Sequence, residues 1–281
     1  MSKQVPVAKE AVVETDDEGS LHHVADDVAY LRLAIVNAVV VGRAQSENDR
    51  WVLVDAGVPG MAGRIHRATD AAFGAKPPSA IVLTHGHFDH VGSLQHLAER
   101  WDVPIYAHTE ELPYVTGQRS YPPPDPSVGG GLMALTSPLF PGGPFDFSRW
   151  VRPLPEDGSI PGMPGWRWYH TPGHTAGHVS LWRAADRTLI AGDAFITTKQ
   201  ESAYAVMTQE AEIHGPPAYY TPDWVSAAAS VRRLAALEPE VVVTGHGRAL
   251  HGDEMRRALH LLADNFETIA VPKHGRYVDK T

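Results

Sequence analysis

Residues 84–90 of the chain read THGHFDH, and they follow directly on the apolar run AIVL at residues 80–83. A short apolar run of this kind is typical of a buried strand, and the apolar spacing beyond the motif is typical of a helix. Alternate side chains of an extended segment point the same way. His85 and His87 are therefore expected to converge on one ion, because imidazole is a common ligand of zinc and similar metals.

The same motif carries a second pair of ligand types. Asp89 and His90 fall at the turn into the expected helix, where they can face a second ion. Imidazole and carboxylate groups together suit zinc and other borderline ions. The alternative is a histidine-rich surface loop, since the chain has 16 histidines. The order of the residues and the strand-to-helix context favour the metal site.

Three further segments place a histidine or an aspartate in a tight turn or after an expected strand. His174 lies in TPGHTAGH, where Pro and Gly favour a rigid turn. Asp193 lies in AGDA, and a carboxylate there can bridge two cations with its two oxygens. His246 lies in TGHG, after the apolar run VVV. Each one alone is more often structural, but together they recur at strand ends, where the active sites of α/β proteins gather.

These motifs resemble those of the metallo-β-lactamase superfamily over about residues 28–250. The matching segments are VLVDAG at 52–57, THGHFDH at 84–90, TPGHTAGH at 171–178, AGDA at 191–194 and TGHG at 244–247. The resemblance implies an α/β fold, the four-layer αβ/βα sandwich, with two divalent metal ions at one edge and zinc as the favoured metal. It implies these ligands: His85, His87 and His174 for the first ion, Asp89, His90 and His246 for the second, and Asp193 for both.

Two residues of these motifs are expected to support the ligands rather than to bind metal. Asp55, in VLVDAG, is expected to hold a ligand histidine in place, and the capping of a strand-end turn is an equal alternative. His178, just past the turn that carries His174, is expected to lie behind the ligands. The remaining histidines have no motif around them and are interpreted as ordinary.

Two departures from the family pattern narrow the expected activity. β-Lactamases of the superfamily lack the bridging aspartate and many use a cysteine ligand, whereas this chain has Asp193 and no cysteine. His87 stands where the flavodiiron branch has glutamate, which disfavours redox chemistry. The resemblance implies hydrolysis of a small lactone or carboxylic ester by a hydroxide shared between two cations, with Asp89 or a loop tyrosine returning the proton. A phosphodiesterase and a glyoxalase-II-type thioesterase are the alternatives.

Composition limits the partners. The chain has 281 residues, a formal net charge of −9 and no cysteine, hence no disulfide and no thiolate ligand. The acidic charge disfavours general binding to nucleic acids, and no apolar run approaches the roughly 18 residues that span a bilayer. We expect a cytoplasmic enzyme with a small-molecule substrate and with neither nucleic acid nor membrane as a partner.

The domain organisation predicted from the sequence is simple. Residues 1–20 are polar and acidic and are expected to form a flexible arm, followed by a single metallo-β-lactamase-fold domain at 21–281. A Pro- and Gly-rich insertion at about 115–165 is typical of a lid or binding loop, and a surface excursion or the contact of a homodimer is an equal alternative. Loop residues after Asp193 could line the substrate pocket, with ordinary packing as the alternative for each: Tyr204, Met207, His214, Tyr219 and Tyr220.

The hydrophobic pattern predicts the remaining regular structure. Strands are expected at residues 29–37, 38–42, 51–55, 80–84, 103–107, 166–170, 179–183, 188–191 and 241–243. Helices are expected at residues 61–73, 91–101, 221–237 and 253–266. The third helix is expected to begin with Thr221 as N-cap and Pro222 at its first position. Its apolar face is expected to carry Val225, Ala228, Val231, Leu234 and Ala235.

Overall fold

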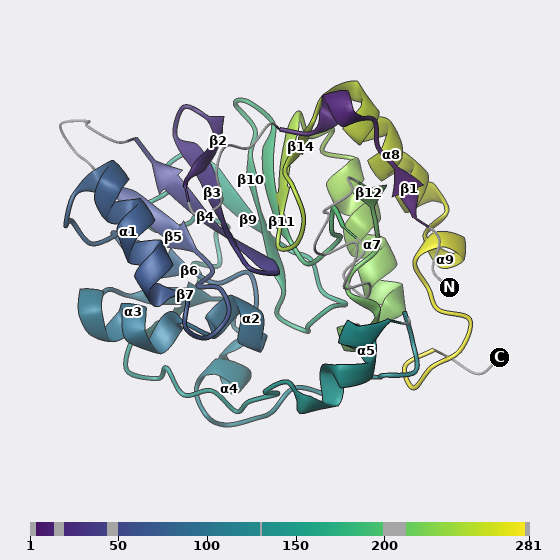
Figure 1. Ribbon diagram of the computed structural model, residues 1–281, viewed down its shortest axis with the longest axis horizontal. Helices are drawn as coiled ribbons and strands as arrows, with labels where there is room; N and C mark the ends of the chain where they lie inside the picture. The colour runs from purple at the N-terminus through teal and green to yellow at the C-terminus, as the bar shows by residue number, and fades with distance from the viewer. Residues whose placement is uncertain (1–3, 14–19, 44–49, 130, 199–211, 279–281) are drawn as a thin grey trace. The chain divides into compact units, whose positions relative to one another are not determined.

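The structure is a computed structural model that describes residues 4–13, 20–43, 50–129, 131–198 and 212–278. The chain divides into two compact units. Unit 1 comprises Met1–Val13, Pro122–Gly142 and Tyr169–Thr281, and unit 2 comprises Glu14–Tyr121 and Gly143–Trp168. Each unit has helices of its own (Figure 1), and each has its own cluster of buried hydrophobic side chains.

Unit 2 is built on a sheet that has seven strands in the described residues, in the order β2-β3-β4-β5-β6-β7-β8. Strands β2 to β5 pair antiparallel, and β5 to β8 pair in parallel. The strands are β2 (His22–Ala25), β3 (Val28–Leu33), β4 (Val36–Gly42), β5 (Trp51–Val54), β6 (Ala80–Val82), β7 (Ile105–Ala107) and β8 (Val151–Pro153). The parallel strands β5 and β6 end side by side, so the segments that follow them meet at one edge of the sheet.

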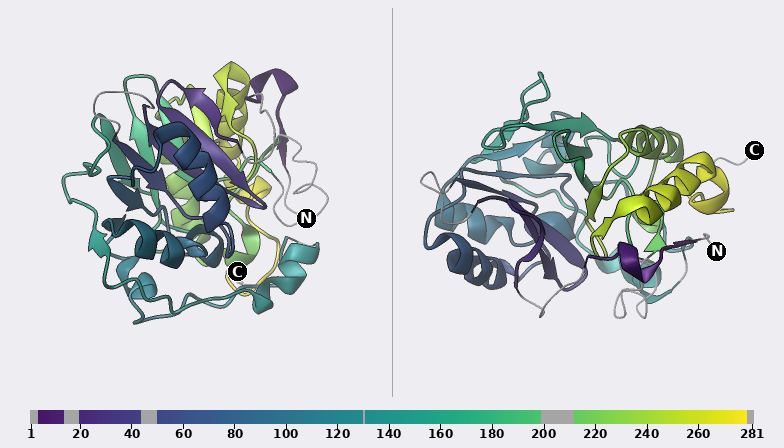
Figure 2. Two further views of the ribbon diagram at one scale, coloured as in Figure 1. Left: turned by 60° about the vertical axis from the view of Figure 1, so that its left-hand side comes forward. Right: turned by 90° about the horizontal axis from the view of Figure 1, so that it is seen from above.

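Helices α1 (Ala62–Phe73) and α3 (Leu94–Trp101) pack on this sheet (Figures 1 and 2). Trp51 of β5 anchors the contact, because its ring stacks on Phe73 at a centroid distance of 5.1 Å and meets Trp101 edge-on at 5.5 Å. Burial of a side chain such as Phe73 stabilises the fold by about 1.5–3 kcal/mol. This packing positions β5 and therefore Asp55, which follows it.

Unit 1 contains most of a second sheet, whose strand order is β14-β13-β11-β10-β9, and the boundary between the units falls within β9, after Trp168. The strands are β9 (Trp166–His170), β10 (Val179–Arg183), β11 (Thr188–Gly192), β13 (Val241–Thr244) and β14 (Leu250–His251). Helices α7 (Trp224–Ala235) and α8 (Gly252–Asp264) share a buried core with β11 and β13. Strands β11 and β13 pair in parallel, so Asp193 and His246, which follow them, come to the same edge of this sheet.

Shorter elements complete the described chain. They are β1 (Val5–Pro6), η1 (Lys9–Ala11), α2 (Phe88–Val91), α4 (Leu112–Val115), α5 (Leu132–Thr136), η2 (Ser137–Leu139), β12 (Glu212–Ile213), η3 (Ala218–Tyr220) and α9 (Phe266–Ile269). None of the described helices is both long enough and apolar enough to cross a membrane.

The predicted N-terminal arm differs from the structure over residues 5–12. Strand β1 pairs antiparallel with β12, and Val12 forms a β-bridge with Leu250. Val5 and Ala11 are buried in unit 1, and Val5 belongs to its core. These two apolar side chains, scattered in a polar segment, give residues 5–12 a fixed place in unit 1.

The predicted insertion at 115–165 also contributes to regular structure. Strand β8 pairs in parallel with β7 and forms the edge of the unit 2 sheet. The segment is divided between the units, with Pro122–Gly142 in unit 1 and the remainder in unit 2. The single domain at 21–281 stays a prediction, because a division into two compact units is compatible with one αβ/βα sandwich as well as with two domains.

The third predicted helix begins later than expected, and its N-cap was predicted wrongly. Helix α7 starts at Trp224, and Asp223 is its N-cap, because the Asp223 carboxylate accepts a hydrogen bond from the backbone N–H of Ser226 at 2.9 Å. The Thr221 hydroxyl instead donates to the Pro217 carbonyl at 2.8 Å. The predicted apolar face is wrong at Val225, which is 78% exposed, while the Trp224 side chain is buried.

The helix predicted at 91–101 begins later, as α3 at Leu94; Val91 ends the separate short helix α2, and Gly92 and Ser93 lie between the two helices. The Ser93 hydroxyl donates to the Val58 carbonyl at 2.8 Å and accepts from the Met61 backbone N–H at 2.9 Å. This side chain therefore ties the start of α3 to the loop after β5.

The strand boundary predicted at residues 37 and 38 was also misplaced. Strand β3 ends at Leu33, and β4 begins at Val36. Ala34 between them has a φ of +62°, so the turn comes earlier than the apolar pattern indicates.

Candidate metal centre

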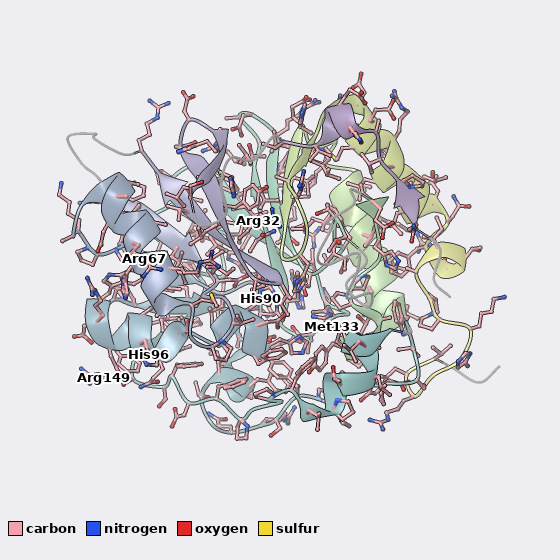
Figure 3. All side chains as sticks on the ribbon, viewed as in Figure 1. Arg32, Arg67, His90, His96, Met133 and Arg149 are labelled. Atoms are coloured by element: carbon pink, nitrogen blue, oxygen red, sulfur yellow. The ribbon has the colours of Figure 1, made fainter. Side chains whose placement is uncertain are left out.

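In unit 2, the segment from the end of β6 through α2 brings three imidazoles together. His85, His87 and His90 are 0, 5 and 0% exposed. The ring centroids of His85 and His87 lie 4.8 Å apart, and those of His85 and His90 lie 4.1 Å apart. Asp89 is also buried, with a carboxylate oxygen within 4.8 Å of a ring nitrogen of His90. His96 of α3 is exposed by comparison, so burial distinguishes the motif residues from this neighbouring histidine (Figure 3).

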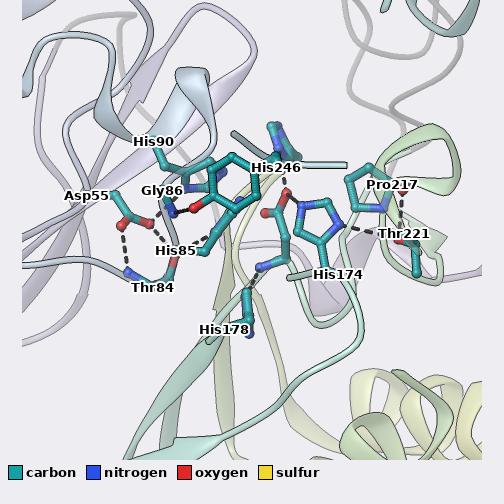
Figure 4. Close-up of polar contacts among 12 residues, drawn as sticks. Asp55, Thr84, His85, Gly86, His90, His174, His178, Pro217, Thr221 and His246 are labelled. Atoms are coloured by element: carbon teal, nitrogen blue, oxygen red, sulfur yellow. Dashed lines mark hydrogen bonds and ion pairs between the residues drawn. The ribbon is translucent and has the colours of Figure 1, made fainter. Parts of the chain in front are cut away.

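Asp55, directly after β5, holds two parts of this segment. Its Oδ1 accepts from the backbone N–H of Thr84 at 2.8 Å, and its Oδ2 accepts from the Thr84 hydroxyl at 2.7 Å (Figure 4). Oδ2 also lies 2.8 Å from Nδ1 of His90. A carboxylate accepts the ring proton in such a contact, which leaves Nε2 as the ligand atom of His90. Asp55 thus plays both roles that the sequence suggested, support of a histidine and capping of a strand end.

In unit 1, Asp193 lies beside two histidines. Its Oδ2 is 3.4 Å from Nε2 of His174 and 3.1 Å from Nε2 of His246 (Figure 4). All three side chains are at most 2% exposed. Unit 1 therefore gathers the other three predicted ligands around one carboxylate oxygen.

The ring proton of His174 can be placed from its neighbours. Thr221 Oγ1 lies 3.3 Å from Nδ1 of His174, and its single hydroxyl proton is donated to the Pro217 carbonyl (Figure 4). Thr221 can then only accept from His174, so Nδ1 carries the proton. Nε2 consequently faces Oδ2 of Asp193 and, in a neutral ring, presents its lone pair to that oxygen. The two atoms at 3.4 Å repel each other unless a proton or a metal cation lies beside them.

His178 lies behind Asp193 and starts a chain of hydrogen bonds. Its Nε2 accepts from the backbone N–H of Asp193 at 2.9 Å, so its proton is on Nδ1. Nδ1 donates to Thr171 Oγ1 at 2.9 Å, and Thr171 donates to Ser180 Oγ at 3.0 Å. Ser180 donates to the Ala191 carbonyl at 2.8 Å. The donor and the acceptor of every hydrogen bond in this buried network are thus assigned. The network holds the backbone of Ala191 and Asp193, on either side of Gly192.

We expect Thr171→Val to lower the free energy of unfolding by about 1–3 kcal/mol, because the buried Nδ1–H of His178 loses its acceptor. Valine has the shape of threonine, so packing is kept. Chemical denaturation of the metal-free protein measures the loss. Thr188→Val, at another buried threonine of unit 1, is the matched control. An equal loss of unfolding free energy in both variants would mean that the hydrogen-bond network of His178 is unimportant for stability.

Gly173 permits the turn that carries His174 to pass close to α7. Its φ is +132°, and a Cβ there would lie 2.4 Å from the backbone nitrogen of Ala227. We expect Gly173→Ala to destabilise the protein by about 1–3 kcal/mol through this clash with main chain. Gly74→Ala, which also has a positive φ but has no neighbour within 4 Å of a Cβ, is the control for backbone strain alone. Denaturation midpoints of the two variants would coincide if the clash were unimportant.

The geometry of both units is that of a known family. The family model of the metallo-β-lactamase superfamily matches residues 31–246 of the chain. The chain belongs to the metallo-β-lactamase superfamily.

Relatives and solved structures agree with this membership. The chain is 47% identical to the probable metallo-hydrolase YflN of Bacillus subtilis over 252 residues, which are 89% of this chain and 95% of that protein. A β-lactamase domain protein from Burkholderia ambifaria has the same fold, with a TM-score of 0.64 at 19% identity over 94% of this chain and 79% of that one. The di-iron-bound form of TTHA1623 gives a TM-score of 0.51 at 27% identity, over 83% and 95% of the two chains.

The α/β fold class predicted from the sequence is confirmed by the family match and by these structures. The superfamily membership and the metallo-hydrolase relative make the protein a metal-dependent hydrolase.

The donor atoms of this superfamily member fit divalent cations. Unit 2 supplies three imidazoles and a carboxylate, and unit 1 supplies two imidazoles and a carboxylate, all of them buried. Burial of so many polar groups costs free energy unless hydrogen bonds, opposite charges or a metal ion compensate for the lost contacts with water. The contact between Nε2 of His174 and Oδ2 of Asp193 calls for positive charge at that point, which a bound cation or a proton can supply. Nitrogen and oxygen donors of this kind bind zinc, iron and other divalent ions.

Three residues near the predicted ligands were missed by reasoning from the sequence. Thr221 was assigned to a helix cap, and Glu111 and Tyr121 belong to no motif. The Glu111 side chain is fully buried, and its Oε1 accepts from the backbone N–H of Gly86 at 3.0 Å and from the Tyr121 hydroxyl. Burial, followed by the negative charge of Glu111, raises the pKa of Tyr121 well above its ordinary value, so this hydroxyl keeps its proton.

The loop residues proposed to line a pocket have mixed outcomes. Tyr204 and Met207 lie outside the described residues. His214 and Tyr219 are buried, and the backbone of His214 exchanges hydrogen bonds with Ile196. A role for these residues in substrate binding stays a prediction.

Proposed function

We propose that this protein hydrolyses a small lactone or carboxylic ester with two divalent metal ions, and that zinc is the metal. The observation that carries the proposal is the shared oxygen of Asp193, which lies within 3.4 Å of Nε2 of both His174 and His246. A carboxylate oxygen next to two imidazoles suits a pair of cations, because its two oxygens can contact both of them. The absence of cysteine and the presence of Asp193 favour an ester or lactone over a β-lactam.

The proposed ligand assignment follows the family. His85, His87 and His174 hold the first ion, Asp89, His90 and His246 hold the second, and Asp193 contributes to both. Two features support it: the four donors that unit 2 gathers and the three that unit 1 gathers.

When bound, the ions supply a water that is nucleophilic at neutral pH and polarise the substrate carbonyl. The chain's own residues do the rest. Asp55 keeps the His90 ring proton on Nδ1, and Thr221 does the same for His174, so both rings present Nε2. Asp89 takes the proton of the attacking water on its carboxylate and returns it to the alkoxide oxygen, which becomes the free alcohol of an ester or the hydroxyl group of a ring-opened lactone.

Parallel assays on metal-characterised protein test the substrate class. The assays use a lactone, an aryl ester, a thioester, a β-lactam and a phosphodiester at equal concentration. We expect the lactone or the aryl ester to give the highest kcat/KM. Preference for the thioester or the phosphodiester would replace the proposal by the corresponding hydrolase.

His87→Ala tests the metal dependence in the same assays. The variant is expected to lose one ion by elemental analysis and to lose turnover. His96→Ala, at the exposed histidine of α3, controls for the removal of an imidazole (Figure 3). Full activity of His87→Ala, or activity in parent protein that carries no metal, would reject the two-ion mechanism.

A further inference from the structure

The peptide unit of Gly86 joins the two histidines that begin the motif. Its N–H donates to two acceptors at once, Oε1 of Glu111 and the hydroxyl oxygen of Tyr121, each at 3.0 Å. The Tyr121 hydroxyl in turn donates its own proton to Oε1 of Glu111. The three groups form a closed triangle in which the carboxylate receives both protons.

The triangle is assembled from three distant parts of unit 2. Glu111 precedes α4 and is 25 residues from Gly86, and Tyr121 is 35 residues away at the start of the Pro-rich run. Its groups are nearly inaccessible to water, with Glu111 0% and Tyr121 7% exposed. A buried hydrogen bond to a charged acceptor contributes more than one between neutral groups, so the triangle is a strong local restraint.

Tyr121 also contacts the imidazole that follows Gly86. Its ring meets that of His87 at a centroid distance of 4.6 Å and an interplanar angle of 62°. The Tyr121 side chain therefore contacts both the backbone of Gly86 and the ring of His87, a predicted ligand. The Gly86 N–H belongs to the peptide that links His85 to Gly86, so the triangle restrains the backbone next to one histidine while the Tyr121 ring contacts the other.

Glycine is required between the two histidines because the triangle comes so close. A Cβ at residue 86 would lie 2.5 Å from the Tyr121 hydroxyl oxygen and 2.5 Å from a methyl carbon of Val115. The lack of a side chain lets Glu111 and Tyr121 reach the backbone N–H. Glycine at position 86 is thus needed because Tyr121 and Val115 come so close, and not because the backbone has an unusual φ.

We propose that Glu111 and Tyr121 are positioning residues, which hold the Gly86 peptide so that His85 and His87 present their ligand atoms to the same ion. This inference rests on the proposed metal site. Outer groups that orient metal ligands typically change metal affinity by about 10–100-fold when they are removed.

Metal affinity measured by competition with a chromophoric chelator tests the proposal. Tyr121→Phe deletes one hydroxyl and is expected to weaken one of the two binding steps about tenfold. Tyr114→Phe is the matched control, because Tyr114 is 8% exposed, stacks on Tyr121 at 4.3 Å and loses the same atom. We expect Tyr114→Phe to bind metal like the parent.

Two substitutions at Glu111 separate hydrogen bonding from charge. Glu111→Gln keeps an oxygen that accepts from Gly86 and Tyr121, so its metal affinity is expected to stay within about threefold of the parent. Glu111→Leu removes the acceptor and is expected to weaken binding by about 10–100-fold. A Glu111→Gln variant as weak as Glu111→Leu would overturn the proposal, since charge would then be the important property.

The visible spectrum of the Co²⁺-substituted protein gives a readout independent of turnover. Tyr121→Phe is expected to change its d–d bands, whereas a merely structural role would lower the unfolding free energy and leave bands and affinity unchanged. A parent protein that binds no metal would reject the proposed function itself. A parent that binds metal, with Tyr121→Phe equal to Tyr114→Phe, would reject only the positioning role.

Discussion

Asp193→Asn is expected to lower kcat/KM by about 1,000-fold, which corresponds to about 4 kcal/mol of transition-state stabilisation. Asparagine has the same shape, and the backbone N–H of residue 193 can still donate to His178. The change removes one negative charge from the oxygen that lies beside Nε2 of both His174 and His246. The loss should therefore reflect charge rather than packing.

Metal content and turnover are to be measured on the same preparation of Asp193→Asn. We expect at least one ion to be lost, with an unfolding free energy of the metal-free protein close to that of the parent. Asp186→Asn is the control, because Asp186 is a partly exposed aspartate of unit 1 that pairs with Arg183. If Asp193→Asn kept two ions and its rate, the carboxylate would not be a bridging ligand.

Asp55→Asn is expected to weaken metal binding by about 10–100-fold and to lower the unfolding free energy by about 1–3 kcal/mol. An amide offers one acceptor oxygen where the carboxylate offers two. If that oxygen serves the Thr84 N–H, the amide NH₂ faces the Thr84 hydroxyl and Nδ1 of His90. His90 must then move its proton or rotate, and its Nε2 is no longer presented as before.

Backbone strain does not contribute to the effect of Asp55→Asn, because asparagine tolerates the φ of +62° at residue 55 nearly as well as aspartate. Asp102→Asn is the control, since Asp102 has a φ of +48° in the same unit and accepts from the indole N–H of Trp150 at 2.8 Å. Isothermal titration with Zn²⁺ and chemical denaturation supply the two readouts. Equal effects at residues 55 and 102 would mean that the His90 contact is unimportant.

The sequence predicts best what local patterns determine. The apolar run at residues 80–83 is buried and contains β6 (Ala80–Val82), as its short length and the polar residues after it predict. The polar residues after such strands must lie at a sheet edge, so the sequence alone places His85, Asp193 and His246 at such edges. Their roles as metal ligands stay predictions.

The errors occur where a side chain has two suitable partners. Thr221 has the composition of an N-cap, but its hydroxyl bonds the Pro217 carbonyl and accepts from His174 instead. Asp223 then caps α7, and the helix starts two residues later than predicted. The predicted apolar face is wrong at Val225, which is exposed, and omits Trp224, which is buried.

Glu111 and Tyr121 could not be found from the sequence without the fold. Neither lies in a recognisable motif, and each reaches Gly86 across 25 or more residues. The only local signal is the small Gly86 between two histidines, and glycine is common in turns whether or not a side chain contacts its backbone. Contacts of this kind depend on where strands β6 and β7 place the following loops.

The placement of the ring protons of His90 and His174 on Nδ1 bears on metal selectivity. Both rings are oriented by neighbours in their own unit before an ion arrives, so binding requires little reorganisation of the ligands. A preorganised shell of nitrogen and oxygen donors accepts several divalent ions, and availability then decides which one is bound. Zinc is the proposed metal, and we expect cells supplied mainly with iron or manganese to yield the same folded protein with those ions in place of zinc.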